Sequence, residues 1–459
     1  MASKSSPLSR RRVLKAAGAA AMTGGSALLG GSAFAQAPAV LTNSQAGRRF
    51  RAYVKFTRER PTIVELRARA LIERQVLLRV EAAQTCYTNV DQCLIAGYPM
   101  PPNGASVIGH GGVGIVEAIG PQVLHTRVGD RVVVNLHNAC GKCFNCLRMR
   151  SDKCMSNQAG PAVPRYDMAD GTPVFGGTGA MAELMICNEE QEVSIFSDVS
   201  SAELSMLPCV GGCGLGMAFT NVPVDLGSDV VVFGAGPVGL SALMGAKMKG
   251  ASQLIMVEPI RYRRELAMKL GATATLDPNQ YKERKLRPEP GIEVVIASDR
   301  HEDALVEKIR DMCKMKNTRV WAGGNRIGPD HVMEAVGGDR LKPKEVQGPD
   351  PTGVTVLQQC WELCSAIGTL ATCSVGQPSG SLVEIPATQW ADGAKHHWGG
   401  TGGGTNDRRD VPLFARLMET GQLNMKAVVG ATYPLSQARE AYQACADRTV
   451  ISTVVTPTA

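Results

Sequence analysis

A strand, a glycine-rich turn and a helix follow one another directly in the middle of this chain of 459 residues. The apolar run Asp229 to Phe233 has the character of a buried strand, and a helical stretch extends to about Lys249. The turn between them contains Gly234, Gly236, Pro237, Val238 and Gly239. A second apolar run, Gln253 to Val257, ends in Glu258. This order predicts a doubly wound α/β domain with a parallel sheet.

The turn has the spacing of a dinucleotide site. Gly234 permits a tight turn, Gly236 lets a pyrophosphate approach the backbone, and Gly239 lets the helix pack on the strand. The phosphates would lie at a helix N-terminus, whose N–H groups and dipole favour anions. Glu258 would bind the ribose hydroxyls and repel a 2′-phosphate, so we expect NAD. Three arginines that could hold the extra phosphate keep NADP as the less favoured alternative: Arg261, Arg263 and Arg264. A turn without nucleotide is the purely structural alternative.

Four cysteines share one short segment, Cys140, Cys143, Cys146 and Cys154. Four thiolates at such spacings can surround Zn²⁺ as a tetrahedron. A site closed by four protein ligands has no open position, so we expect it to order its loop rather than to react. Two disulfides are the alternative in an oxidising compartment.

The N-terminal segment has the features of an export signal. Ser9 to Lys15 resembles the twin-arginine signal, and a weakly apolar stretch ends in the small-x-small sequence Ala33 to Ala35. An uncleaved membrane anchor is the alternative. Residues 1–35 hold five basic residues and no acid, so without them the net charge falls from +7 to +2. The rest of the chain lacks the excess of positive charge that is typical of nucleic-acid-binding proteins. No later stretch is apolar enough to span a membrane. We therefore expect a soluble, periplasmic or secreted protein exported by the twin-arginine machinery.

The pattern of the chain changes near Asp225. Before it, short alternating runs separated by glycine-rich corners predict an antiparallel, barrel-like β domain. After about Gly376 the chain is irregular, then predicts a helix at 411–419 and final strands that return to the first domain. The expected parts are a signal peptide (1–35), a linker (36–48), a catalytic domain (49–213, with a cysteine lobe at 138–156), a coenzyme domain (214–378) and a return segment of the catalytic domain (379–459).

Cys86, His110 and Cys213 stand far apart in distinctive contexts, and each alone fits a buried thiol or a loop histidine. Together with Gly-His-x-x-x-Gly at 109–114, the four-cysteine segment, the glycine turn and Glu334 to Gly337, they give a chain that resembles the zinc-dependent medium-chain alcohol dehydrogenase family from about residue 50 onward. The resemblance implies a GroES-like β-barrel catalytic domain joined to a Rossmann coenzyme domain. It also implies that Cys86, His110 and Cys213 bind a catalytic zinc, which makes two zinc ions per chain.

The resemblance extends to the residues around the zinc, with departures. Thr88 falls where the family has the hydroxyl that relays the alcohol proton, and Asp91 stands about where some members have a relay histidine. Asn89 replaces an aspartate and Gly111 replaces the glutamate after the zinc-binding histidine. Both losses are expected to weaken the support of the metal site.

The implied function is an oxidoreductase that transfers hydride between a small alcohol or aldehyde and NAD, as a homo-oligomer (dimer or tetramer). A polar, Pro/Gly-rich loop at 339–353 resembles the insertion of the formaldehyde dehydrogenase and dismutase branch, which keeps its NAD bound. The alternative is thus an aldehyde dismutase or acceptor-dependent dehydrogenase with permanently bound NAD. A non-catalytic zinc and nucleotide-binding protein is a further alternative. Four clustered residues are candidates for the pocket or a lid: Trp390, His396, His397 and Trp398.

Overall fold

The computed structural model describes residues 45–99, 101, 104–157, 163–281, 283–285, 301–313, 328–385, 390–391, 393–400 and 402–458. The predicted signal peptide, most of the linker and much of the region 277–326 lie outside these residues. In the part of the chain that is described, none of the helices has the length and hydropathy that crossing a bilayer requires.

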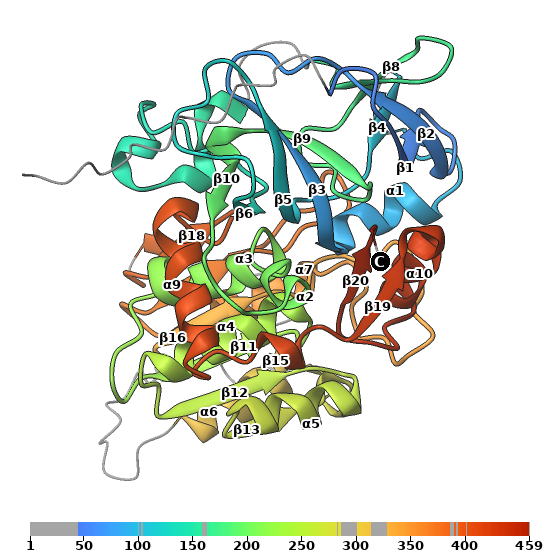
Figure 1. Cartoon of the computed structure of the whole chain (residues 1–459). Helices are drawn as coiled ribbons and strands as arrows, with labels where there is room; N and C mark the ends of the chain where they lie inside the picture. Colours follow the sequence, from blue (N-terminus) through green and yellow to red (C-terminus); the bar gives the residue numbers. More distant parts are fainter. Residues whose placement is uncertain are drawn as a thin grey trace, which may run out of the picture. The chain divides into compact units, whose positions relative to one another are not determined.

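The first part of the chain forms a small closed barrel and a larger sheet beside it (Figure 1). The barrel strands, in order, are β1 (Arg49–Phe56), β2 (Thr62–Ala68), β7 (Tyr166–Asp167), β8 (Pro173–Phe175) and β4 (Ala105–Val107). The order in the seven-stranded sheet is β10 (Glu192–Ser194), β6 (Arg131–Val134), β5 (Gly112–Ile119), β3 (Gln75–Gln84), β20 (Thr453–Thr456) and β19 (Ala431–Pro434), and β9 (Leu184–Asn188) also pairs with β3. The predicted barrel-like β domain is therefore present.

The C-terminal segment returns to this sheet, as the sequence predicted. Val454 and Val455 of β20 pair antiparallel with Gln84 and Ala83 of β3. The red strands β19 and β20 lie beside the helix α10 (Ala438–Asp447) in Figure 1. Tyr442 of α10 is buried and stacks on Tyr53 of β1, so the helix seals the apolar core on this side.

The coenzyme domain contains a six-stranded sheet whose strands pair in parallel. Its order is β13 (Ala274–Leu276), β12 (Gln253–Val257), β11 (Asp229–Phe233), β16 (His331–Glu334), β17 (Thr369–Thr372) and β18 (His396–Gly399). Strands β11 and β12 have the predicted bounds, and the predicted helix is α4 (Pro237–Met248). Val230, Val231 and Val232 are fully buried, as expected for a central strand covered on both faces.

The other helices are mostly connections between strands. They are α1 (Val90–Leu94), α2 (Ser201–Leu204), α3 (Val210–Gly216), α5 (Arg261–Leu270), α6 (Ala304–Met312), α7 (Val354–Leu363) and α9 (Asp407–Glu419). A two-stranded ribbon, β14 (Glu283–Lys285) with β15 (His301–Asp303), is separate from these sheets. Helix α9 contains the helix expected at 411–419 and begins four residues earlier, where the Asn406 side chain caps it.

Four residues, Trp390, His396, His397 and Trp398, were the predicted candidates for the pocket or a lid. His396, His397 and Trp398 belong to the exposed strand β18, which pairs only with β17 among the described strands. Trp390 stacks on Trp361, with ring centroids 5.7 Å apart. None of these candidates lines the large cavity described below.

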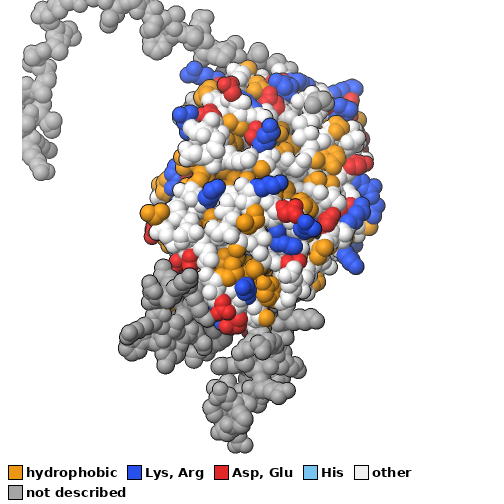
Figure 2. Space-filling model, turned by 90° about the horizontal axis from the view of Figure 1, so that it is seen from below, with side chains coloured by type: hydrophobic (Ala, Val, Ile, Leu, Met, Phe, Trp, Pro, Cys, Tyr) orange, Lys and Arg blue, Asp and Glu red, His pale blue; other side chains and the backbone are white. Residues whose placement is uncertain are grey.

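The surface carries charges of both signs. In the face shown in Figure 2, Lys and Arg side chains (blue) are interspersed with Asp and Glu (red) and with apolar groups (orange). Among the described side chains of this face, no large field of one sign is visible.

Candidate active site

Two thiols and one imidazole meet where strands of the large sheet end. Cys86 follows β3, His110 precedes β5, and Cys209 directly precedes α3. The potential ligand atoms of the three lie within 4.8 Å of one another. Cys209 Sγ is 3.6 Å from Cys86 Sγ and 3.9 Å from His110 Nδ1. Two thiolates and an imidazole form a donor set that Zn²⁺ accepts while keeping a fourth position open, so the residues fit this ion.

Cys213, the third ligand expected from the sequence, does not belong to this cluster; Cys209 takes its place. The Cys213 N–H donates to the Cys209 carbonyl (2.7 Å), so the two residues are one helical turn apart. Cys209 stands before the first helical residue with a non-helical backbone (φ −141°, ψ −85°), which directs its thiol toward Cys86. The Cys213 thiol lies next to Cys209 and Cys373. Sequence spacing alone does not distinguish two cysteines that occupy one face of a turn.

Thr88 is the predicted relay residue closest to the cluster. Its Oγ1 lies 3.1 Å from Cys86 Sγ and 3.4 Å from His110 Nδ1, and the residue lines the cavity. Asp91 also lines the cavity, and burial raises the pKa of its carboxyl. Asn89 is buried outside the cavity lining, and its N–H donates to the Cys86 carbonyl. The structure therefore brings Thr88 to the cluster and gives Asn89 a supporting position.

At Gly111 the departure from the family pattern concerns the backbone conformation as well as the missing carboxylate. It has φ +84°, a region that side chains rarely adopt, and its N–H donates to the Thr178 carbonyl (2.8 Å). A Cβ added there would clash with the Val134 carbonyl and come within 2.8 Å of Pro208 Cβ. No carboxylate can stand at this position without moving the chain.

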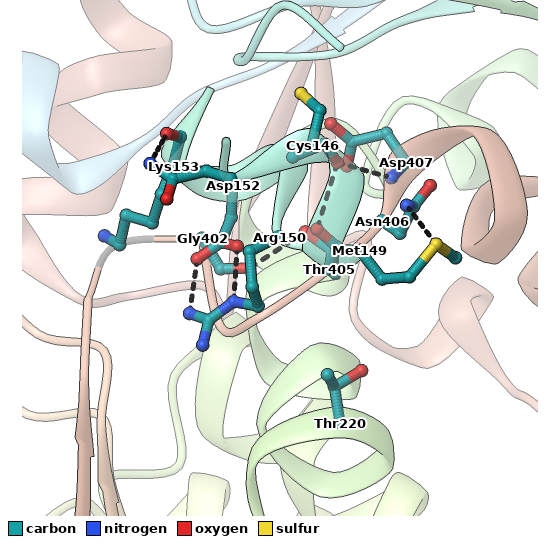
Figure 3. A network of polar contacts seen from close by, with 12 residues as sticks. Cys146, Met149, Arg150, Asp152, Lys153, Thr220, Gly402, Thr405, Asn406 and Asp407 are labelled. Carbon is teal, nitrogen blue, oxygen red and sulfur yellow. Dashed lines mark hydrogen bonds and ion pairs between the residues drawn. The ribbon is translucent and has the colours of Figure 1, made fainter. Parts of the chain in front are cut away.

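The second cluster is the four-cysteine lobe. The sulfurs of Cys140, Cys143, Cys146 and Cys154 lie within 4.8 Å of one another, and all the described cysteines are free thiols. Figure 3 shows how the lobe is held against residues 402–407. Ser151 Oγ donates to the Thr405 carbonyl (3.2 Å) and accepts from the Asp407 N–H (3.3 Å). The lobe is thus a compact thiol cage fixed to the return segment.

The glycine turn has the geometry that close approach of a nucleotide requires. Gly234 has φ +90°, and a Cβ at Gly239 would clash with the Gly234 carbonyl. Nothing lies within 4 Å of a Cβ placed at Gly236, so space remains above the turn. Glu258 accepts hydrogen bonds from the N–H groups of Ala235 (2.7 Å) and Ile260 (2.9 Å). The carboxylate is therefore fixed beside the turn.

One large cavity connects the glycine turn to the Cys86 cluster. Its volume is about 1320 Å³. The predicted nucleotide-site residues that line it are Gly234, Gly236, Pro237, Val238, Glu258 and Arg263; Gly239 does not. Cys86, His110, Cys209 and Cys213 line it as well. Arg263 also donates to the Val450 carbonyl (3.0 Å), which ties α5 to the return segment. A dinucleotide and a small substrate could occupy the same continuous space.

The loop 339–353 has no helix or strand and borders this cavity. Asp339 forms an ion pair with Arg448, and Arg340 forms one with Asp91 (3.3 Å). Lys344 pairs with Asp447 (2.6 Å). The loop is thus attached both to the segment after β3 and to the end of α10.

Two residues of the site, Arg448 and His137, were not predicted from the sequence. Arg448 pairs with Asp339 of the loop and lines the cavity, and His137 follows β6 and lines the same cavity. Proximity to Cys140 was the only signal for His137, and nothing in the sequence distinguishes Arg448 from a surface arginine.

Comparison with known proteins agrees with this architecture. Residues 73–197 match the family described as "Alcohol dehydrogenase GroES-like domain". The chain is 35% identical over 215 residues to "Geraniol dehydrogenase" of Castellaniella defragrans, which covers 45% of this chain and 56% of that protein. It is 33% identical over 221 residues to "Probable alcohol dehydrogenase" of Pseudomonas sp, covering 45% of this chain and 67% of that one. The matched region therefore spans about half to two thirds of these relatives. Its fold resembles the crystal structure of an alcohol dehydrogenase zinc-binding domain protein from Burkholderia ambifaria, with a TM-score of 0.70, 25% identity, and coverage of 90% of this chain and 100% of that chain.

Proposed function

Because this chain belongs to the zinc-type medium-chain alcohol dehydrogenase family, we propose that it oxidises a small alcohol, or reduces the aldehyde, with NAD as the coenzyme. The observation that carries this proposal is the continuous cavity that joins the glycine turn to the Cys86, His110 and Cys209 cluster. An enzyme for hydride transfer needs these two sites in one enclosed space, since the reacting carbons must be held in line.

The residues have distinct parts in such a reaction. Cys86, His110 and Cys209 would hold zinc, which when bound supplies a Lewis acid that lowers the pKa of an alcohol. Thr88 is placed to accept the alcohol proton, since its hydroxyl lies beside the cluster at the cavity wall. Asp91, one turn further along, is the next group that could pass the proton on.

Metal analysis tests this assignment. We expect two zinc ions per purified chain, one in each cluster. Cys209→Ser should remove one of them together with activity, whereas the matched variant Cys213→Ser should keep both. Loss of zinc from Cys213→Ser but not from Cys209→Ser would contradict the assignment. Zinc and NAD binding without turnover of any alcohol or aldehyde would favour the non-catalytic alternative.

The four-cysteine lobe is proposed to hold the second, structural zinc. Cys143→Ser should lower the unfolding temperature and remove one zinc ion, because such an ion contributes directly to folding. A lobe that keeps its stability and the full zinc content after this change would exclude a structural site.

A second candidate function is supported by the loop 339–353. Ion pairs hold it at the cavity border, where it would slow the escape of a nucleotide. The protein would then keep its NAD between turnovers. In a dismutation, two aldehydes and one water become one acid and one alcohol, with no net change of the nucleotide. Otherwise an external acceptor takes the electrons.

Bound NAD is tested on extensively dialysed protein. Denaturation should release about one NAD per chain, and turnover should need no added nucleotide. Protein that is free of nucleotide and saturates simply with added NAD would be an ordinary exchanging dehydrogenase.

The proposal extends to location and assembly. Export by the twin-arginine machinery to the periplasm rests on residues 9–35, which hold the basic motif, the weakly apolar stretch and the small-x-small site, and cleavage after Ala35 should appear as a mature N-terminus at Gln36. Among the described strands β18 pairs only with β17, so its other edge could pair with a second copy, which supports a homo-oligomer. Light scattering on a variant with a proline in β18 would test this contact.

A further inference from the structure

His137 occupies the cavity wall without a part in the proposed zinc or proton chemistry. After β6 the chain passes through Leu136, His137 and Asn138 before it enters the cysteine lobe, and all three residues line the cavity. Cys86, Thr88 and His110 line the same cavity. His137 does not belong to the metal cluster, so its imidazole is not a ligand of that group.

The His137 ring is neutral at physiological pH. Burial lowers the pKa of His137 to about 4, although the nearby Asp152 carboxylate acts in the opposite direction. A neutral imidazole presents one N–H donor and one nitrogen acceptor. The ring can therefore make two hydrogen bonds of opposite sense.

The polar groups next to His137, on the side away from the cavity, already have hydrogen-bond partners. Asp152 lies nearby, but both of its carboxylate oxygens accept hydrogen bonds from Arg150, each 2.8 Å long. Figure 3 shows this pair beside Gly402. Asp152 also donates its N–H to the Thr405 carbonyl (3.3 Å). The wall behind the ring is thus held by contacts between the lobe and the return segment.

Gly402 packs closely against this wall. A Cβ at Gly402 would clash with Asp152 Cβ and lie 3.2 Å from His137 Cε1. The ring cannot retreat from the cavity on this side. No hydrogen bond joins the ring nitrogens to another described residue, and His137 lines the cavity, so the ring is placed to meet a ligand there.

We propose that His137 is a substrate-binding residue that hydrogen-bonds a second oxygen of the substrate. The favoured substrates are small alcohols with a neighbouring hydroxyl, and aldehyde hydrates, which carry two hydroxyls on one carbon. This inference rests on the proposed alcohol dehydrogenase function. A purely apolar alcohol would displace water from the imidazole and leave its nitrogens unpaired, which disfavours binding. Asn138 and Thr178 are further polar residues that line the cavity.

The test compares two alcohols of equal chain length, propane-1,2-diol and propan-1-ol. For the wild-type protein the diol should have the higher kcat/KM. His137→Phe should lower the ratio of the two kcat/KM values by about 10- to 100-fold, because the variant loses one hydrogen bond that only the diol can make. His137→Gln should restore part of the ratio. The control His331→Gln, at a buried histidine outside the cavity, should leave the ratio unchanged.

Zinc content, unfolding temperature and the calorimetric affinity for the diol complete the measurement. An unchanged ratio in a folded, zinc-loaded His137→Phe protein would overturn the role of His137. Wild-type protein that turns over no alcohol or aldehyde would instead overturn the proposed function, and diol affinity would still report on His137.

A second variant leaves His137 in place. Gly402→Ala should displace Asp152 and the His137 ring and reduce the diol preference at least several-fold. At Gly399 an added Cβ meets nothing closer than 3.4 Å, so Gly399→Ala is the matched control. Equal diol preference in the two alanine variants would contradict the proposed placement of the ring.

Discussion

The ion pair between Asp339 and Arg448 is expected to control how fast the nucleotide leaves. The two side chains are 9% and 14% exposed, and Asp339 also accepts from the Tyr87 hydroxyl (3.4 Å). Asp339→Asn keeps the shape and removes the charge. A hydrogen bond to a charged, largely buried group contributes about 2 kcal/mol, and removing the charge leaves Arg448 unpaired. Loss of about 2 kcal/mol from the closed loop should speed release about 30-fold.

Stopped-flow fluorescence of NADH release measures this rate. The control is Lys344→Gln in the same loop, because Lys344 is 72% exposed and its pair with Asp447 is screened by solvent. We expect that control to change release by no more than about twofold. The double variant Asp339→Asn with Arg448→Gln should release NADH little faster than either single variant, because both break one interaction. Additive effects of the two substitutions, or equal release rates for Asp339→Asn and the wild type, would refute the role of this ion pair in holding the loop closed.

Two further predictions concern coenzyme choice and pH. Glu258→Ser should raise the affinity for NADP relative to NAD, because it removes a carboxylate beside the turn. The affinity for both nucleotides should fall, since the N–H groups of Ala235 and Ile260 lose their acceptor. The measurement that decides is therefore the ratio of the two dissociation constants. Burial raises the pKa of Asp407 to about 7, while an unfolded carboxyl titrates near pH 4. The folded state therefore binds the extra proton between these values, and its stability falls as pH rises from about 4 to 7. Asp407→Asn should raise the unfolding temperature at pH 8 relative to the wild type more than at pH 5; the same difference at both pH values would show that Asp407 does not titrate as described.

Local patterns predicted the parts of this fold that depend on neighbouring residues. Strand β11 begins and ends at the residues expected from its apolar run, because burial on both faces requires continuous apolar side chains. The four-cysteine lobe is equally local, since its ligands span 15 residues, from Cys140 to Cys154.

The site was harder to predict where distant segments decide it. Whether Cys209 or Cys213 faces Cys86 depends on where α3 begins, and helix boundaries are poorly marked in a glycine-rich segment. Gly111 could be read as a lost carboxylate, but its contact with Val134 is visible only in three dimensions. The contacts of Asp339 with Arg448 and of His137 with Gly402 join residues more than 100 positions apart, and no local sequence pattern predicts them.

The central place of β20 has a consequence for the order in which this protein matures on the ribosome. The last strand inserts between β3 and β19, and the Thr85 N–H donates to the Thr453 carbonyl (2.9 Å). All six strands of the coenzyme sheet are synthesised before it. Because domains fold as units during synthesis, the coenzyme sheet can form while the catalytic domain still waits for its final residues. Until then β19 lacks its partner and the end of β3 stays open to foreign strands, so loss of β20 should expose both edges and favour aggregation.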